Sequence, residues 1–429
     1  MKIVNKIKYQ TVFKIGILNS FGILIRLFTG ILSAKAIAVF IGPSGMALMG
    51  NFRNVMASIE GIASFGFPNG IVKYVSEYKE DHKKINSLFS TVLIFVSAIL
   101  IFAVLLFAFF SQWLNHYIFG DQFSFSFLFV VMAFAFPLQV LNGIFVAVLN
   151  GLGYFKKVIY LNIAGNVLGV TATVLLLLVA ELRGALLGMV ISPALLFFLS
   201  WYWVKKEVKF ELKTVDKQWL YPLFSFSIMA LFTTLCTPAV YFYVRRLIIQ
   251  YCGLEQAGYW EAMQRLSGFY MLFISTLISI YFLPKLSACR SGNEAKQYIK
   301  IYQQFILPVF AIGIVVFYIF RNQTTTLFLD RSFLPLSDYL FWQLIGDFLK
   351  AFALIYGIMF YSYRLVIPYL ITESISFLLF YGLSFYWISS EGITGVTKAH
   401  SVVYLVYSII LLIYFSRYFN KHFPQPDKL

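Results

Sequence analysis

Charged residues are scarce in this sequence. Asp, Glu, Lys and Arg together make up 12% of the 429 residues, whereas hydrophobic residues make up 60% and the mean hydropathy is +0.80. Soluble domains carry about twice that share of charge, roughly 25%. Apolar runs of about 20 residues, long enough to cross a bilayer, recur along the whole chain. The sequence therefore predicts an all-α integral membrane protein.

Cysteine and histidine are also rare. The three cysteines, Cys236, Cys252 and Cys289, lack metal-ligand spacing, and their odd number argues against a disulfide framework. No histidine lies in a pattern of paired carboxylates or metal ligands, so we expect neither a cofactor nor an enzyme. The net charge of +16 does not indicate nucleic-acid binding, because the basic residues lie between and inside apolar runs.

Hydropathy predicts twelve membrane spans, an even number that places both termini on one side. Basic residues assign that side: 23 of the 34 lie in the termini and alternate loops, and only Arg183, Arg321 and Arg331 lie in the loops between. The positive-inside rule thus predicts cytoplasmic termini, and we expect no cleavable signal peptide. The predicted spans are 12–41, 45–72, 88–110, 123–149, 157–180, 184–204, 219–250, 254–283, 301–320, 336–362, 365–388 and 393–416.

The basic segment 205–217 divides six spans from six, which suggests an internal repeat. An offset of 212 places Arg53 on Arg265, and "RGALLG" (183–188) corresponds to "EGITGV" (391–396) at an offset of 208. We expect an N-terminal six-helix lobe over 1–204, a cytoplasmic linker over 205–217 and a C-terminal six-helix lobe over 218–429. Two such lobes around a central cavity suit alternating access.

Charged residues inside the spans are the candidates for a functional site, because burying a charge in a membrane costs at least roughly 2.5–3.5 kcal/mol. Basic residues outnumber acidic ones there, which favours an anionic cargo such as a phosphate or pyrophosphate and argues against a drug-cation exporter. The twelve residues are Arg26, Lys35, Arg53, Arg245, Arg246, Arg265, Lys350, Lys398, Glu60, Glu261, Asp347 and Glu373.

Helical geometry distinguishes these candidates. Arg26 shares a small, polar face with Ser33, whereas Lys35 lies about 180° round the same helix. Lys35 therefore reaches the same cavity only if the helix bends near Gly30. Arg246, Lys398 and His400 are expected to lie toward the membrane interface.

Three combinations of opposite charge are either structural ion pairs or parts of the site. They are Arg53 with Glu60 on one face, Glu261 with Arg265 at i, i+4, and Asp347 with Lys350 at i, i+3. A further acid, Glu373, lies in mid-helix and is either a proton-titrating group or the partner in an ion pair.

Five stretches resemble the Wzx-type polysaccharide flippases of the multidrug/oligosaccharidyl-lipid/polysaccharide exporter superfamily, and within them the enterobacterial common antigen branch. They are "GPSGMALMGNFRNV" (42–55), "GIVKYVSEY" (70–78), "GALLGMVISPAL" (184–195), "YFLPKLS" (281–287) and "WQLIGDFLK" (342–350). The resemblance implies two lobes in a V shape. It also implies that family members carry a basic residue at the positions of both Arg26 and Lys35. Asp347 and Lys350 match residues of the corresponding stretch in the family.

The function that this resemblance implies is translocation of an undecaprenyl-pyrophosphate-linked oligosaccharide, of O-antigen or common-antigen type, to the periplasmic leaflet of the bacterial inner membrane. We expect a monomer among membrane lipids, with glycan polymerase machinery as a partner. For coupling, three alternatives are open: a proton site or a Na⁺ site at Asp347 or Glu373, or the membrane potential.

The sequence is also compatible with other functions. They are a lipid II or capsule or teichoic-acid precursor exporter, a multidrug exporter of the same superfamily, and a membrane glycan polymerase or ligase. Under the leading interpretation we expect the pyrophosphate to be bound by Arg26, Lys35, Arg53, Arg245, Arg265 and Lys350, and coupling or ion pairing to involve Asp347, Glu373, Glu60 and Glu261.

Overall fold

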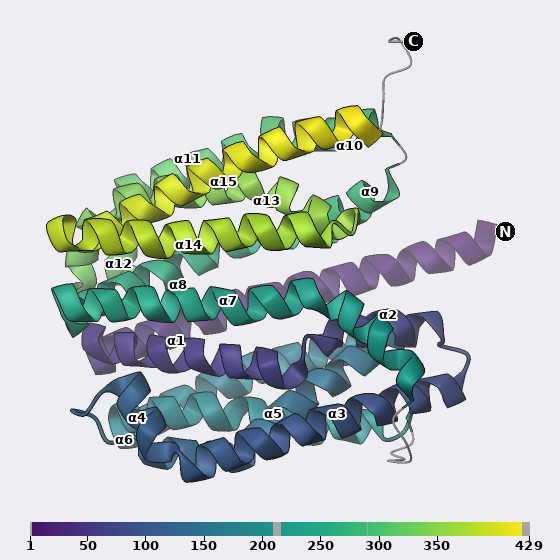
Figure 1. Cartoon of the computed structure of the whole chain (residues 1–429), viewed down its shortest axis with the longest axis horizontal. Coiled ribbons are helices and arrows are strands. Elements are labelled where there is room, and N and C mark those ends of the chain that lie inside the picture. Colours follow the sequence, from purple (N-terminus) through teal and green to yellow (C-terminus); the bar gives the residue numbers. More distant parts are fainter. Residues whose placement is uncertain (1, 209–215, 290, 423–429) are drawn as a thin grey trace. The chain divides into compact units, whose positions relative to one another are not determined.

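A computed structural model describes residues 2–208, 216–289 and 291–422, and every regular element in this part of the chain is helical. Residues 209–215 of the predicted linker lie outside it. Figure 1 shows the helices, which are α1 (Lys2–Ser64), α2 (Phe67–Glu77), α3 (His82–Phe109), α4 (Ser111–Phe119), α5 (Ser126–Gly151), α6 (Phe155–Val204), α7 (Leu220–Cys252), α8 (Leu254–Leu277), α9 (Leu283–Ala288), α10 (Gly292–Ile301), α11 (Leu307–Ile319), α12 (Arg321–Phe328), α13 (Leu340–Ser362), α14 (Val366–Glu391) and α15 (Ile393–His422).

Ten of these helical stretches, taken over the described residues, are long and apolar enough to cross a membrane. Helices suit this environment because they satisfy every backbone hydrogen bond internally. The prediction of an all-α, multi-pass membrane protein is confirmed. Three segments predicted as loops instead contain short helices: α4, α12, and α9 with α10 between the eighth and ninth predicted spans.

Two of the ten stretches are too long for a single crossing. The stretch in α1 runs for 47 residues and α6 for 50, about 70–75 Å at 1.5 Å per residue, against a hydrocarbon core of about 30 Å. Both helices contain a break in backbone geometry, at Gly42 in α1 and at Ala180–Glu181 in α6. A crossing on each side of either break would give the predicted twelve spans, a count that stays a prediction.

The backbone breaks recur along the chain at a constant spacing of 211 residues. Gly42 and Gly253 both have positive φ (69° and 91°), and Glu181 (φ 48°, ψ −129°) is matched by Gly392 (φ 59°, ψ −136°). This spacing replaces the offsets of 212 and 208 suggested by sequence motifs. At an offset of 211 residues, Arg53 corresponds to Gln264 and not to Arg265.

A third pair of breaks, Gly153 and Arg364, has the same spacing and the same hydrogen bonds. In each, the amide of the positive-φ residue donates to the carbonyl three residues back, and the next amide donates five residues back. Such an ending satisfies the last carbonyls of a helix. The two halves of the chain therefore share one backbone plan.

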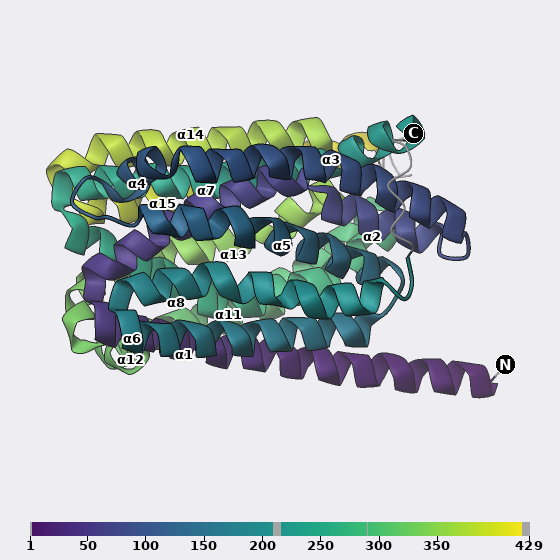
Figure 2. The same cartoon turned by 90° about the horizontal axis from the view of Figure 1, so that it is seen from below.

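The chain divides into two compact units, residues 1–41 with 48–239 and residues 42–47 with 240–429. In the first, α5 packs against α6, α3 and α2; in the second, α15 packs against α13 and α14 (Figures 1 and 2). Helix α7 contributes to both units, whereas the predicted division assigned all of it to the second lobe. The predicted lobe boundaries stay a prediction.

Aromatic rings fill the core of the first unit. Phe107 packs against Phe136 and Phe129, with ring centroids 5.3 and 6.5 Å apart, and all three side chains are fully buried. In the second unit, Gly346 on α13 allows close approach to α15, because a Cβ there would lie 2.2 Å from the His400 ring. This contact brings the polar residues of α13 and α15 together.

Candidate functional site

A polar pocket of about 590 Å³ lies within the first unit, between the N-terminal half of α1 and both halves of α6. Its polar lining consists of one cation, three amides and three hydroxyls: Arg26, Asn19, Asn162, Asn166, Ser33, Thr173 and Ser192. Apolar helices rarely gather so many polar groups at membrane depth, because unsatisfied polar groups there cost several kcal/mol each. The pocket is therefore a candidate binding site in the first unit.

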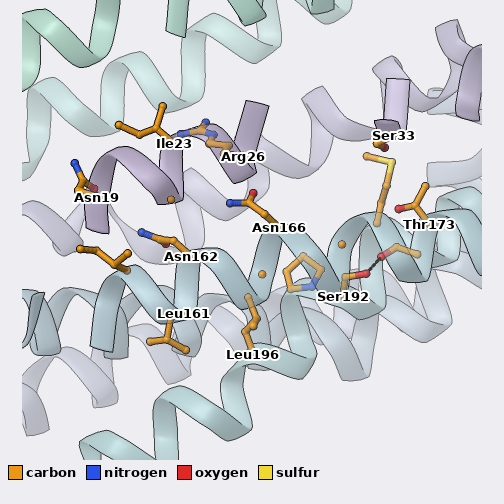
Figure 3. Close-up of a pocket in the computed structure, with 17 residues that line it drawn as sticks. Asn19, Ile23, Arg26, Ser33, Leu161, Asn162, Asn166, Thr173, Ser192 and Leu196 are labelled. Atoms are coloured by element: carbon orange, nitrogen blue, oxygen red, sulfur yellow. Dashed lines mark hydrogen bonds between the residues drawn. The ribbon is translucent and has the colours of Figure 1, made fainter. Parts of the chain in front are cut away.

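Arg26 is the charged residue of this pocket. Its side chain is exposed, and in the part of the chain that the structure describes its guanidinium forms neither an ion pair nor a hydrogen bond. Figure 3 shows Asn162 and Asn166 extending from α6 toward the α1 residues Asn19 and Arg26. A guanidinium in this setting can bind phosphate oxygens through two parallel hydrogen bonds.

Glycine keeps the pocket open. A Cβ on Gly169 would meet nothing within 4 Å, so this residue borders empty space. By contrast, a Cβ on Gly165 would lie 2.7 Å from Leu196, so here glycine lets the two halves of α6 pack closely. The asparagines are not predicted from the sequence, because they are neutral and the prediction of site residues rests on charged residues inside the spans. The i, i+4 pair Asn162 and Asn166 inside an apolar run was the available signal.

The other candidates of the first unit do not line this pocket. Helix α1 has its break at Gly42 and continues through Gly30, so the bend that would bring Lys35 beside Arg26 is not present. Glu60 accepts a hydrogen bond from Gln139 of α5 at 2.9 Å. Roles for Lys35, Arg53 and Glu60 at a pyrophosphate or coupling site stay predictions.

The second unit contains a buried ionic triad. Glu261 on α8 accepts from Arg245 of α7 at 2.5 Å and from Arg265, one turn along α8, at 3.1 Å. The side chains of Arg245 and Glu261 are fully buried, and the Arg245 guanidinium lies 5.2 Å from the Trp260 ring centroid. The ion pair expected between Glu261 and Arg265 is present. Arg245, expected at the cargo, lies in the same cluster.

Asp347 lies at the centre of a second buried cluster. Its carboxylate accepts from Ser267 at 2.6 Å, from Gln343 at 3.3 Å and from Tyr270, and it is 3.0 Å from Nε2 of His400. The side chain of His400 is 3% exposed, so it does not extend toward the interface as expected: the close approach of α13 and α15 at Gly346 places the ring beside Asp347.

Among the described residues Asp347 and Lys350 do not form a direct ion pair, since Ser267, Tyr270, Gln343 and His400 occupy the carboxylate. Lys350 instead lies 5.5 Å from the ring centroid of Tyr404.

Glu373 and Lys398 each have a partner outside the two clusters described above. Glu373 on α14 accepts from the hydroxyl of Tyr407 on α15 at 2.6 Å. Lys398 pairs with Glu391 at 2.5 Å near the α14–α15 connection, in keeping with its expected place at a span end. The coupling roles of Asp347 and Glu373 stay predictions.

Comparison with solved structures defines the class of the fold. The chain matches the lipid II flippase MurJ in an inward closed conformation with a TM-score of 0.73, covering 96% of this chain and 88% of that one at 18% identity. A multidrug resistance MATE family transporter of the MOP superfamily, inward-facing, gives 0.72 over 93% and 98% at 14% identity. The fold is thus the two-lobe helical fold of this transporter superfamily.

The family follows from the sequence. Residues 14–290 match the family described as polysaccharide biosynthesis protein, and the chain belongs to this family. The lipid III flippase of Escherichia coli (strain K12) is 25% identical over 388 residues, which cover 90% of this chain and 93% of that protein. The lipid III flippase of Shigella flexneri matches to the same extent. The resemblance inferred from the five sequence stretches is confirmed.

Proposed function

We propose that this protein is a flippase that moves an undecaprenyl-pyrophosphate-linked oligosaccharide from the cytoplasmic to the periplasmic leaflet of a bacterial inner membrane. The observation that carries the proposal is the pocket beside Arg26, whose guanidinium has no acidic partner among the described residues. The names of the relatives, lipid III flippases, support a lipid-linked cargo. No bond in the cargo is broken, so the protein acts as a transporter and not as an enzyme.

In this mechanism Arg26 binds the pyrophosphate at membrane depth, and the isoprenoid tail stays in the lipid. A charged head group cannot cross the hydrocarbon unaided, because the cost of desolvating it is prohibitive. Alternating exposure of the bound head group to the two sides would remove that barrier. The termini would face the cytoplasm, as the distribution of basic residues predicts.

The test is complementation of Escherichia coli strains that each lack one flippase, read by surface glycan analysis. We expect the wild-type chain to restore glycan export in the strain lacking lipid III flippase. Arg26→Ala should lower export at least tenfold, because one charge-assisted hydrogen bond contributes about 1.5–3 kcal/mol. Arg26→Lys should retain part of the activity, since Lys keeps the charge but loses the bidentate geometry.

Lys398→Ala is the matched control. Lys398 is a cation of a membrane helix that pairs with Glu391 near the end of its span. It should support export at the wild-type level. Full export by Arg26→Ala, at equal amounts of protein in the membrane, would contradict the role of Arg26. Failure of the wild type in every strain would contradict the proposed function.

A further inference from the structure

The pocket of the first unit carries more polar groups than a pyrophosphate requires. Arg26 supplies its positive charge, whereas Asn19, Asn162 and Asn166 add three neutral amides. Each amide offers two donors and two acceptor positions. A phosphate only accepts hydrogen bonds at neutral pH, so it would leave the amide oxygens unused. A ligand that both donates and accepts matches this lining better.

We propose that Asn19, Asn162 and Asn166 form a subsite for the sugar ring directly attached to the pyrophosphate, beside the Arg26 position that binds the phosphate. Sugar hydroxyl and acylamino groups both donate and accept, as amides do. This inference rests on the proposed function, because it assigns a part of the same cargo to the same pocket. It makes the pocket selective for the sugar and not only for the anion.

The state of these amides supports a ligand. Across the described ranges of the chain, none of the three side chains forms a hydrogen bond with another protein group. Figure 3 shows Asn162 and Asn166 directed into the space between α6 and α1. Polar groups at membrane depth that have no protein partner must be satisfied by water or a ligand.

The internal repeat shows that the open pocket is not a necessary result of the fold. At the spacing of 211 residues, Asn162 corresponds to Glu373 and Gly169 to Phe380. In the second unit these positions are packed: Glu373 accepts from Tyr407, the counterpart of Leu196, and Phe380 packs against Tyr241. The same backbone plan thus carries a hydrogen-bonded carboxylate and a buried aromatic ring at these positions in one unit, and an amide-lined pocket in the other.

The test compares two probes on the purified, full-length protein in lipid nanodiscs. The probes are undecaprenyl pyrophosphate and undecaprenyl-pyrophosphoryl-N-acetylhexosamine, and the readout is the Kd of each. Wild type should bind the sugar-bearing probe about tenfold more tightly, since a site built to hydrogen-bond a group rejects the analogue that lacks it. Asn162→Ala/Asn166→Ala should lose this preference and keep its affinity for undecaprenyl pyrophosphate. Arg26→Ala should weaken both probes by a similar factor.

A steric variant gives a second, independent test. Gly169→Phe copies the residue found at the counterpart position and projects into the pocket without a clash at Cβ. It should abolish the preference for the sugar-bearing probe. Gly143→Phe is the matched control: it lies in mid-helix in α5 of the same unit, also has nothing within 4 Å of a Cβ, and does not line the pocket. It should bind both probes as wild type does.

The outcomes separate this inference from the proposed function. The sugar subsite would be overturned if wild type bound the two probes with equal affinity, or if the asparagine variant lost affinity for both. Either result would leave the flippase proposal standing. If neither probe binds more tightly than an ordinary phospholipid, both the sugar subsite and the flippase proposal are overturned. An unchanged preference in both Gly169→Phe and the asparagine variant would place the sugar outside this pocket.

Discussion

At the residue scale, the charges inside the membrane helices fall into two groups. Arg26 faces a pocket without an acidic partner in the described part of the chain, while Glu261 binds two arginines. A buried ion pair contributes little net stability, but removing one partner leaves a costly uncompensated charge. The triad of Arg245, Glu261 and Arg265 is thus expected to matter for stability, in contrast to Arg26.

This difference predicts an order of stability among variants of the triad. Glu261→Gln leaves Arg245 and Arg265 close together without the carboxylate, so it should destabilise by about 3–5 kcal/mol. Arg245→Met leaves the Glu261–Arg265 pair intact and should cost clearly less. Thermal unfolding of the detergent-solubilised protein, followed by the fluorescence of a thiol- or tryptophan-based reporter, measures both. A Tm for Arg245→Met as low as that of Glu261→Gln would contradict this account.

At the element scale, glycine decides where helices approach closely. Gly258 on α8 lies directly against the backbone of Pro43, in the segment after the break in α1, and a Cβ there would be 2.0 Å from the Pro43 carbonyl oxygen. Backbone atoms cannot give way as a flexible side chain can. Small residues at such contacts allow membrane helices to pack through van der Waals interactions.

Gly258→Ala is therefore expected to disrupt the contact of α8 with the Pro43 segment. It should lower the yield of folded protein in detergent, measured as the monodisperse peak of a size-exclusion profile. Gly268→Ala is the control on the same helix, since a Cβ at Gly268 meets nothing within 4 Å. Ala raises helix propensity by about 1 kcal/mol over Gly, so this variant should be neutral or stabilising. Equal yields of the two variants would show that the close approach is unimportant.

At the scale of the whole molecule, the chain repeats its backbone plan after 211 residues. Three pairs of positive-φ breaks share that spacing, at Gly42 and Gly253, at Gly153 and Arg364, and at Glu181 and Gly392. The hydrogen bonds at the second pair repeat as well. A repeat of an even number of spans keeps both halves in the same orientation, so matched breaks are expected on the same side of the membrane.

Reporter insertions test this topology. A periplasm-dependent phosphatase reporter placed after Glu181 or after Gly392 should be active, and a fluorescent reporter that folds only in the cytoplasm should be bright at either terminus. The reason is that the breaks at Gly42 and Glu181 would divide α1 and α6 into two crossings each under the predicted twelve spans. An inactive phosphatase after Glu181, with an active one after Gly392, would contradict both the twelve spans and the matched orientation of the halves.

The sequence by itself determined the class of the protein. Sparse charge and recurring apolar runs require helices that satisfy their own hydrogen bonds in lipid, and the charge inside the spans identified Arg26 and the Glu261–Arg265 pair. These properties are local: they depend on composition and on spacing within one helix.

Only the tertiary structure decided which side chains meet. His400 reaches Asp347 because Gly346 lets α15 approach α13, and the asparagines of α6 share a pocket with Arg26 because glycine leaves space between helices. Contacts of this kind join residues far apart in the chain through the packing of whole helices, which no periodicity within a single helix records. The polar pocket and the partners of the buried acids therefore became visible only in three dimensions.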